Sequence, residues 1–443
     1  MSRRFRFIHA ADLHIDSPMR GLSKLQEEDL AEKFRGAARR AFERLVTLAL
    51  ESEVSFVLLA GDISDQGWHD SNTAVFFNRQ VARLTDAGIR LLLVWGNHDI
   101  KGPVAKLPPK HPLVHLFPSN KAETFPLPDL GVAVHGRSLS RSIQQKNLAG
   151  KFPRRVEGAF NIGLLHTSLD GREGHDPYAP CSLDDLLSRD YEYWALGHVH
   201  SHELVLQEPW VVFCGCIQGR HVRETGPKGA VLVEVEDAEV RSLEFRELDL
   251  VRWAQETVDV TGLESIEEVR TRVVALGDAL VAEAGDRPLA VRLGVRGAGA
   301  MVPDMIANPW GWEDRFREWI AGAGAGRVVI EQVKFELEAV QGGADSSLPR
   351  NVVQEIVARI RALPEDPASI RSMALDGKPG GMEKHLEKLF GKLGTAKVRE
   401  LVPSDQEVQQ LMVEAKQRLV ARFLTLGEDE PWEDPSDDGR RES

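Results

Sequence analysis

Metal-binding side chains follow five apolar stretches of the sequence, each at the point where the stretch ends. They are Asp12 with His14, Asp62, Asn97 with His98, His166, and His198 with His200. Imidazole, carboxylate and amide groups all bind divalent metal ions. Two such ions can hold both the attacking and the leaving oxygen of a phosphate ester, and a carboxylate can bridge them. The sequence therefore predicts a centre for two metal ions with phosphoesterase chemistry.

The apolar stretches predict the strands that position these side chains, over residues 5–11, 55–61, 90–96, 160–165 and 191–197. Helical periodicity predicts helices over 25–51 and 72–86. Alternating strands and helices are typical of a parallel sheet, and ligands gather beyond the carboxyl ends of its strands. In an extended D-x-H or H-x-H segment, side chains two residues apart point the same way. We therefore expect all five strand ends to converge on one site.

A chain of 443 residues is expected to fold as more than one domain. Strands after His202 predict a second sheet that completes the first domain, and a new series of strands and helices then predicts a small α/β domain. The helical segment that follows either packs as a core or binds a partner, and the acidic tail is expected to be disordered. The predicted parts are an α/β domain over 1–252, a small α/β domain over 253–340, a linker over 341–350, a helical segment over 351–426 and the tail over 427–443.

The charge balance limits the expected partners. The net charge of -13 does not favour unaided binding to nucleic acid, because neutralisation of phosphates by Lys and Arg supplies most non-specific affinity for DNA. A stretch without acidic residues between Asp129 and Glu157 is either a solvated basic face or a surface for phosphates. No apolar stretch is long enough to span a bilayer, and the N-terminus does not resemble a signal peptide. Three cysteines without a paired pattern agree with a reducing compartment, so we expect a cytoplasmic protein without a membrane partner.

Taken together, the D-x-H, GD-x-x-D, GNHD and G-H-x-H motifs resemble those of the calcineurin-like metallophosphoesterase superfamily. Within it, the chain resembles the SbcD-type DNA repair exonucleases. The opening FIHAADLHIDSP and the segment CIQGRHVRETGPKG at 216–229 are most similar to the YhaO-like branch. The resemblance covers roughly residues 5–250 and implies a two-sheet α/β sandwich flanked by helices. By position and size, the middle domain resembles the DNA-capping domain of that family.

The resemblance also implies roles for individual residues. Asp12, His14 and His200 would hold one ion, Asn97, His166 and His198 the other, and Asp62 would bridge them. His98 would contact the scissile phosphate and protonate or stabilise the leaving oxygen, and we hypothesise that Asp65 orients it. Ligation without thiolate, together with the preference of the family, points to Mn²⁺, with Fe²⁺, Zn²⁺ and Mg²⁺ as alternatives. Arg220 and His221 either contact DNA phosphates or are ordinary loop charges.

These features predict a manganese-dependent phosphodiesterase that hydrolyses DNA as a repair exonuclease. The resemblance further implies an SMC-like ATPase as partner and a homodimer. Two alternatives stay open. One is a small-substrate phosphatase or phosphodiesterase of the same superfamily, although such an enzyme would not need the additional domain. The other is a non-catalytic subunit that binds DNA ends, although the intact set of ligands argues against it.

Overall fold

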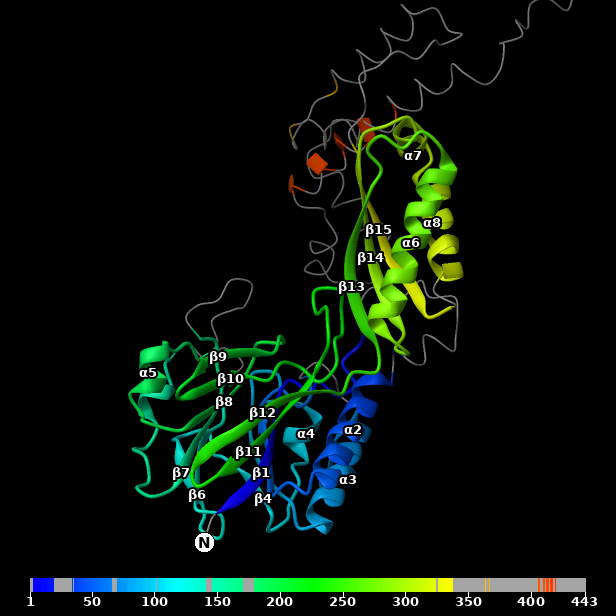
Figure 1. Ribbon diagram of the computed structural model, residues 1–443. Coiled ribbons are helices and arrows are strands. Elements are labelled where there is room, and N and C mark those ends of the chain that lie inside the picture. Colours follow the sequence, from blue (N-terminus) through cyan, green and yellow to red (C-terminus); the bar gives the residue numbers. More distant parts are fainter. Residues whose placement is uncertain are drawn as a thin grey trace, which may run out of the picture. The chain divides into compact units, whose positions relative to one another are not determined.

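The computed structural model describes residues 3–19, 34, 36–65, 70–100, 102–140, 146–169, 179–323 and 326–337, with isolated positions between 363 and 419. Within these residues the strands form two six-stranded sheets and one three-stranded sheet (Figure 1). Most of the helical segment predicted over 351–426, and all of the predicted linker and tail, lie outside the described residues. None of the described helices is long and apolar enough to cross a membrane.

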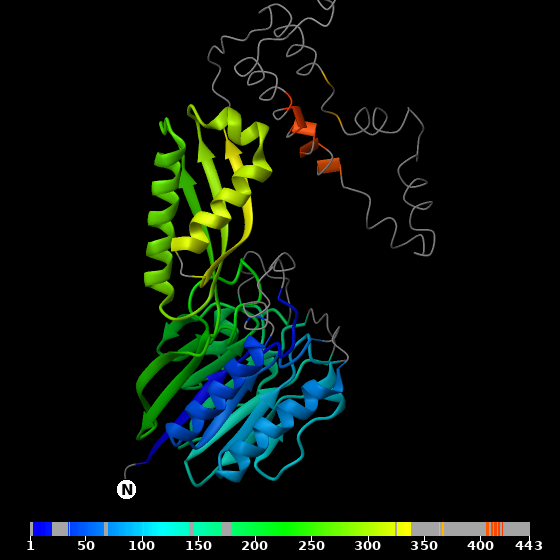
Figure 2. The same cartoon turned by 90° about the vertical axis from the view of Figure 1, so that its right-hand side faces the viewer.

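The first sheet contains the three strands that open the chain. Its order is β12-β11-β1-β2-β3-β4, in which β1 to β4 run parallel and β11 pairs with β1 antiparallel. Helices α2 and α3 lie side by side along this sheet (Figure 2), where Phe42 of α2 stacks on Phe77 of α3 at 5.4 Å. The elements are β1 Arg4–Ala10, α2 Ala37–Glu51, β2 Phe56–Ala60, α3 Ser71–Asp86, β3 Arg90–Val94, α4 Pro103–Lys106, β4 Val114–Leu116, β11 Gly229–Glu236 and β12 Glu239–Glu247.

The second sheet has the order β5-β6-β7-β8-β10-β9. It faces the first sheet across a buried aromatic layer, in which Phe7 of β1 stacks on Phe56 of β2 at 5.1 Å and meets Tyr193 of β8 edge-on at 5.3 Å. The two-sheet sandwich flanked by helices is thereby confirmed. The prediction that the strands after His202 form the second sheet is wrong in part, because β9 and β10 join the second sheet whereas β11 and β12 extend the first, where β11 pairs with β1. The elements of the second sheet and the helices between its strands are β5 Glu123–Leu127, β6 Val132–Arg137, the short helix η1 Ala149–Lys151, β7 Phe160–His166, α5 Leu183–Leu187, β8 Tyr193–Gly197, β9 Glu203–Gln207 and β10 Trp210–Phe213.

The third sheet has the order β13-β14-β15 and confirms the α/β character predicted after residue 253. Gly277 of α6 allows a close approach to α8, since a Cβ atom there would lie 2.8 Å from that of Ala323. On α8, Trp312, Phe316 and Ile320 are buried. The elements are β13 Arg252–Asp259, α6 Ile266–Ala284, β14 Leu289–Gly297, α7 Val302–Ala307, α8 Pro309–Ala323 and β15 Val328–Leu337.

The chain divides into two compact units whose boundary crosses this third sheet. The first comprises residues 1–256, 278–292 and 324–332, and the second comprises 257–277, 293–323 and 333–443. The ends of β14 and β15 nearest residues 289 and 328 thus belong to the unit that holds the two large sheets. The domain limits read from the sequence, at 252 and 340, stay predictions.

Candidate metal centre

The structure brings all the predicted ligands together at the carboxyl ends of five strands. Asp12 and His14 follow β1, Asp62 follows β2, Asn97 follows β3, His166 ends β7, and His198 and His200 follow β8. Backbone groups tie these ends to one another. The Asp12 N–H donates to the Gly61 carbonyl oxygen at 2.9 Å, and the His198 N–H donates to Asp12 Oδ2 at 3.0 Å. The expected convergence of the strand ends is therefore confirmed.

The backbone of the D-x-H pair differs from the prediction. Asp12 and His14 have φ values of 51° and 42°, and His198 in the H-x-H pair has a φ of 106°, so neither segment is extended as predicted. Non-glycine residues rarely adopt positive φ, and such strain persists only where surrounding structure enforces it. Here the His14 N–H donates to the Asp62 carbonyl oxygen at 3.0 Å, which holds the turn. The side chains converge because the chain turns at the strand end, and not because the strand continues.

The donor atoms lie at ligand-to-ligand distances. His14 Nε2 is 3.3 Å from His200 Nε2 and 3.8 Å from Asp62 Oδ2. On the other side of Asp62, the same Oδ2 is 3.4 Å from His166 Nε2, and that nitrogen is 2.9 Å from Asn97 Oδ1. Asp62 thus lies between two groups of donors, as a bridging carboxylate would.

Asp12 is shared by two of the donor groups. One consists of Asp12, His14 and His200, and another of Asp12, Asp62 and His166, with the donor atoms of each within 4.8 Å of one another. Asp12 Oδ1 is buried and accepts no hydrogen bond from the described residues. Buried carboxylate oxygens normally have a partner. The residues therefore fit metal ions, since ligands about 2.1 Å from one ion lie roughly 3 Å apart.

Two carboxylates hold the outer nitrogens of the histidines. Asp65 Oδ1 lies 2.7 Å from His14 Nδ1 and 3.2 Å from His98 Nδ1, and Glu224 Oε1 lies 2.6 Å from His200 Nδ1. Burial opposes the ionisation of Asp65 and Glu224, yet hydrogen bonds from the histidines hold the pKa of both carboxyl groups well below the usual range. An ionised acceptor at Nδ1 leaves Nε2 with its lone pair directed at the centre.

The sequence-based reasoning missed part of this support. It hypothesised that Asp65 orients His98 but did not predict its contact with His14, and it did not single out Glu224. It also gave no role to Asp99, which accepts the backbone N–H groups of Ile63 at 2.8 Å and Gly96 at 2.9 Å and so links the loops after β2 and β3. The D of GNHD was a local signal for Asp99. No local pattern marks Glu224, because its partner is 24 residues away.

The residues predicted to contact DNA occupy one loop beside the centre. The Arg220 side chain is only 12% exposed and lies 3.2 Å from Glu224 and 3.8 Å from Asp65. His221 is 31% exposed and lies 3.4 Å from Glu224. Of the basic stretch between Asp129 and Glu157, Arg155 forms ion pairs with Asp190 and Glu192. His202, two residues after His200, stacks on Phe245 at 4.6 Å.

Comparison with known proteins agrees with this geometry. Residues 5–202 match the calcineurin-like phosphoesterase family, and residues 253–338 match the middle domain of the metallophosphoesterase YhaO. The chain is 35% identical over 321 residues to the uncharacterized metallophosphoesterase YhaO of Bacillus subtilis, covering 70% of this chain and 76% of that protein.

Two further relatives are more distant. The DNA double-strand break repair protein Mre11 of Methanopyrus kandleri is 24% identical over 60% of this chain and 62% of its own length. The SbcD component of the nuclease SbcCD of Escherichia coli is 30% identical over 21% of each chain. The chain therefore belongs to the calcineurin-like metallophosphoesterases, hydrolases with a dinuclear metal centre, and within them to the family of YhaO.

Proposed function

We propose that the chain is a manganese-dependent phosphodiesterase that hydrolyses DNA, acting as a repair exonuclease. The observation that carries the proposal is the convergence of four imidazoles, two carboxylates and one amide group from five strand ends. The names of the Mre11 and SbcCD relatives, a DNA double-strand break repair protein and part of a nuclease, support DNA as the substrate. Ligation by nitrogen and oxygen without thiolate supports Mn²⁺.

In this proposal each ligand keeps the role implied by the family resemblance. Asp12, His14 and His200 hold one ion and Asn97, His166 and His198 the other, while Asp62 bridges them. Two cations held there would stabilise the negative charge of the phosphate and lower the pKa of water. The position of Asp12 in both donor groups supports a closely coupled pair of sites.

His98 is proposed as the catalytic residue. Its side chain is 41% exposed, whereas those of His14 and His166 are fully buried. Because Nδ1 of His98 faces Asp65 at 3.2 Å, Nε2 is the nitrogen that can contact the scissile phosphate and donate a proton to the leaving oxygen. Arg220 and His221, on the adjoining loop, would contact phosphates of the DNA.

The proposal includes an SMC-like ATPase as partner and a homodimer, on the basis of resemblance to the SbcD-type nucleases. The net charge of -13 supports a partner that contributes to DNA binding, since an acidic chain gains little affinity from counterion release. If the isolated chain bound DNA tightly and independently of salt concentration, this part of the proposal would be wrong.

The test is cleavage of end-labelled duplex and single-stranded DNA by the purified chain with Mn²⁺, Mg²⁺ or EDTA. We expect shortening from an end with Mn²⁺, none with EDTA, and a loss of about a hundredfold or more in His98→Gln, as is typical when a general acid is removed. His111→Gln is the matched control, because His111 is exposed and lies outside the centre.

Two other results would count against the proposal. Full activity in His98→Gln would refute the role of His98. Turnover of bis-(p-nitrophenyl) phosphate without cleavage of DNA, even after addition of candidate ATPase partners, would instead favour a small-substrate phosphodiesterase.

A further inference from the structure

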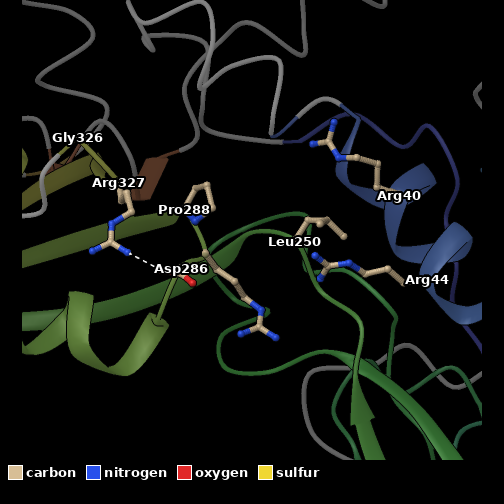
Figure 3. A pocket seen from close by; sticks show the side chains of 8 residues that line it. Arg40, Arg44, Leu250, Asp286, Pro288, Gly326 and Arg327 are labelled. Carbon is tan, nitrogen blue, oxygen red and sulfur yellow. Dashed lines mark hydrogen bonds and ion pairs between the residues drawn. The ribbon is translucent and has the colours of Figure 1, made fainter. Parts of the chain in front are cut away.

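Four arginines line a cavity of about 540 Å³ that contains none of the proposed metal ligands. Arg40 and Arg44 extend from α2, and Arg327 lies at the opposite side, just before β15 (Figure 3). Arg287, just before β14, is the fourth. All of these residues belong to the first compact unit. Like charges repel one another, so four guanidinium groups around one cavity indicate a site for an anion.

Each of three guanidinium groups is held by the protein through only some of its N–H donors. Arg44 Nη1 donates to the Asp249 carbonyl oxygen at 3.0 Å, and Arg287 Nε donates to the same oxygen at 3.0 Å. Within the described part of the chain, Arg287 also donates through Nη2 to Glu247 at 3.0 Å, which leaves its Nη1 available. Arg327 Nη1 donates to the Gly285 carbonyl oxygen at 2.8 Å. Among the described residues, Arg44 and Arg327 donate through Nη1 alone. Fixed guanidinium groups with remaining donors can bind phosphate oxygens in pairs at little entropic cost.

The charged residues of the lining favour an anion over a cation. The lining holds four arginines and one carboxylate, that of Asp286, and the carboxylates of Glu247 and Asp249 outside the lining offset the charge of Arg287. A neighbouring cavity shares Arg40 and Arg44 but adds Glu43, Glu51 and Glu247, so its lining has a net negative charge.

We propose that this cavity binds a compact oligophosphate, such as inorganic triphosphate or the phosphates of a nucleotide, at a site separate from the metal centre. The volume of 540 Å³ lies within the usual range for small-molecule sites and exceeds what one phosphate fills. Leu250 and Pro288 provide an apolar part of the lining between the arginines (Figure 3). The proposal does not depend on the proposed nuclease activity.

The test is isothermal titration calorimetry of the full chain, treated with EDTA so that phosphate cannot bind through metal ions. We expect tripolyphosphate to bind at least about tenfold more tightly than inorganic phosphate. Arg44→Gln and Arg327→Gln should each weaken the binding of tripolyphosphate about tenfold or more, because each removes charge-assisted hydrogen bonds. Asp286→Asn should strengthen it, because a negative charge leaves the lining.

The matched control is Arg79→Gln, which removes the same charge from an exposed position on α3, outside the cavity. Circular dichroism of each variant verifies its fold, and Asp286→Asn keeps the test decisive if an arginine variant unfolds, since Asp286 is exposed. Tripolyphosphate binding that is absent, or unchanged in all three cavity variants, would overturn the proposal.

The same titration with a short duplex DNA distinguishes the source of the phosphates. If the arginine variants lose affinity for DNA while neither the parent chain nor any variant binds tripolyphosphate, the cavity contacts a nucleic-acid backbone and the small-ligand proposal is overturned. His98→Gln should bind tripolyphosphate like the parent chain, so failure here is independent of failure of the proposed nuclease.

Discussion

Replacing Glu224 by Gln should weaken the binding of one of the two metal ions. Both carboxylate oxygens of Glu224 accept short hydrogen bonds, from His200 Nδ1 at 2.6 Å and from the Arg220 backbone N–H at 2.6 Å. A glutamine has only one acceptor oxygen, so its NH₂ group would face one of these two donors. One buried donor would then lack a partner, which costs about 1–3 kcal/mol of stability. The loss of a charged acceptor behind a metal-binding histidine typically lowers metal affinity 10- to 100-fold, about 1.4–2.8 kcal/mol.

Competition between the protein and a fluorescent chelator for Mn²⁺ would measure this effect. We expect one equivalent of Mn²⁺ to bind about 10- to 100-fold more weakly in Glu224→Gln and the other to be much less affected, because Glu224 contacts His200 but not His166. Glu234→Gln is the matched control, since Glu234 lies on β11, outside the centre, and pairs with Arg4 and Arg6 of β1. Unchanged binding of both equivalents would refute the argument, even if the variant were less stable.

Two further predictions concern the strands behind the centre. Gly197→Ala should lower the melting temperature and the affinity for metal, because a Cβ atom there would lie 2.0 Å from the Ala60 carbonyl oxygen. The control Gly322→Ala on α8 should change neither, since a Cβ atom there would have nothing within 4 Å. Equal melting temperatures of the two variants in differential scanning calorimetry would contradict this prediction. Burial lowers the pKa of His9 from 6.5 to about 3. As the pH falls, His9 therefore binds a proton in the unfolded chain before it does so in the folded chain. The stability that neutral, buried His9 contributes is complete above about pH 6.5 and is lost as the pH falls toward 3, by roughly 2 kcal/mol at pH 5. Urea unfolding at pH 7.5 and pH 5 should show a smaller loss of unfolding free energy on acidification in His9→Gln than in the parent chain, and an equal loss would show that His9 is not responsible.

The sequence predicted the strands that carry the ligands because those strands are buried on both faces. Stretches such as 90–96 read as continuous apolar runs, which is typical of central parallel strands. The sequence pattern did not predict β4, β5 and β9, nor β6, which is buried but whose apolar run is interrupted by His135 and Gly136. Val114–Leu116 is three residues long, and every residue of Glu203–Gln207 is at least partly exposed. Short or half-exposed strands carry a weak apolar pattern, and their pairing depends on neighbours elsewhere in the chain.

The sequence by itself determined the types of the proposed metal-binding side chains and their places at strand ends, since both are local properties. Only the tertiary structure decided how these side chains are held. The left-handed backbone at Asp12 and His14 is enforced by contacts with the loop after β2. Glu224 contacts His200 from a loop 24 residues further along the chain, and Asp65 contacts His14 and His98, which follow different strands. These contacts join residues far apart in the chain, so no local pattern encodes them. Pairing of β1, β2 and β3 within the first sheet brings Asp65 to His14 and His98, whereas packing of the two sheets brings Glu224 to His200.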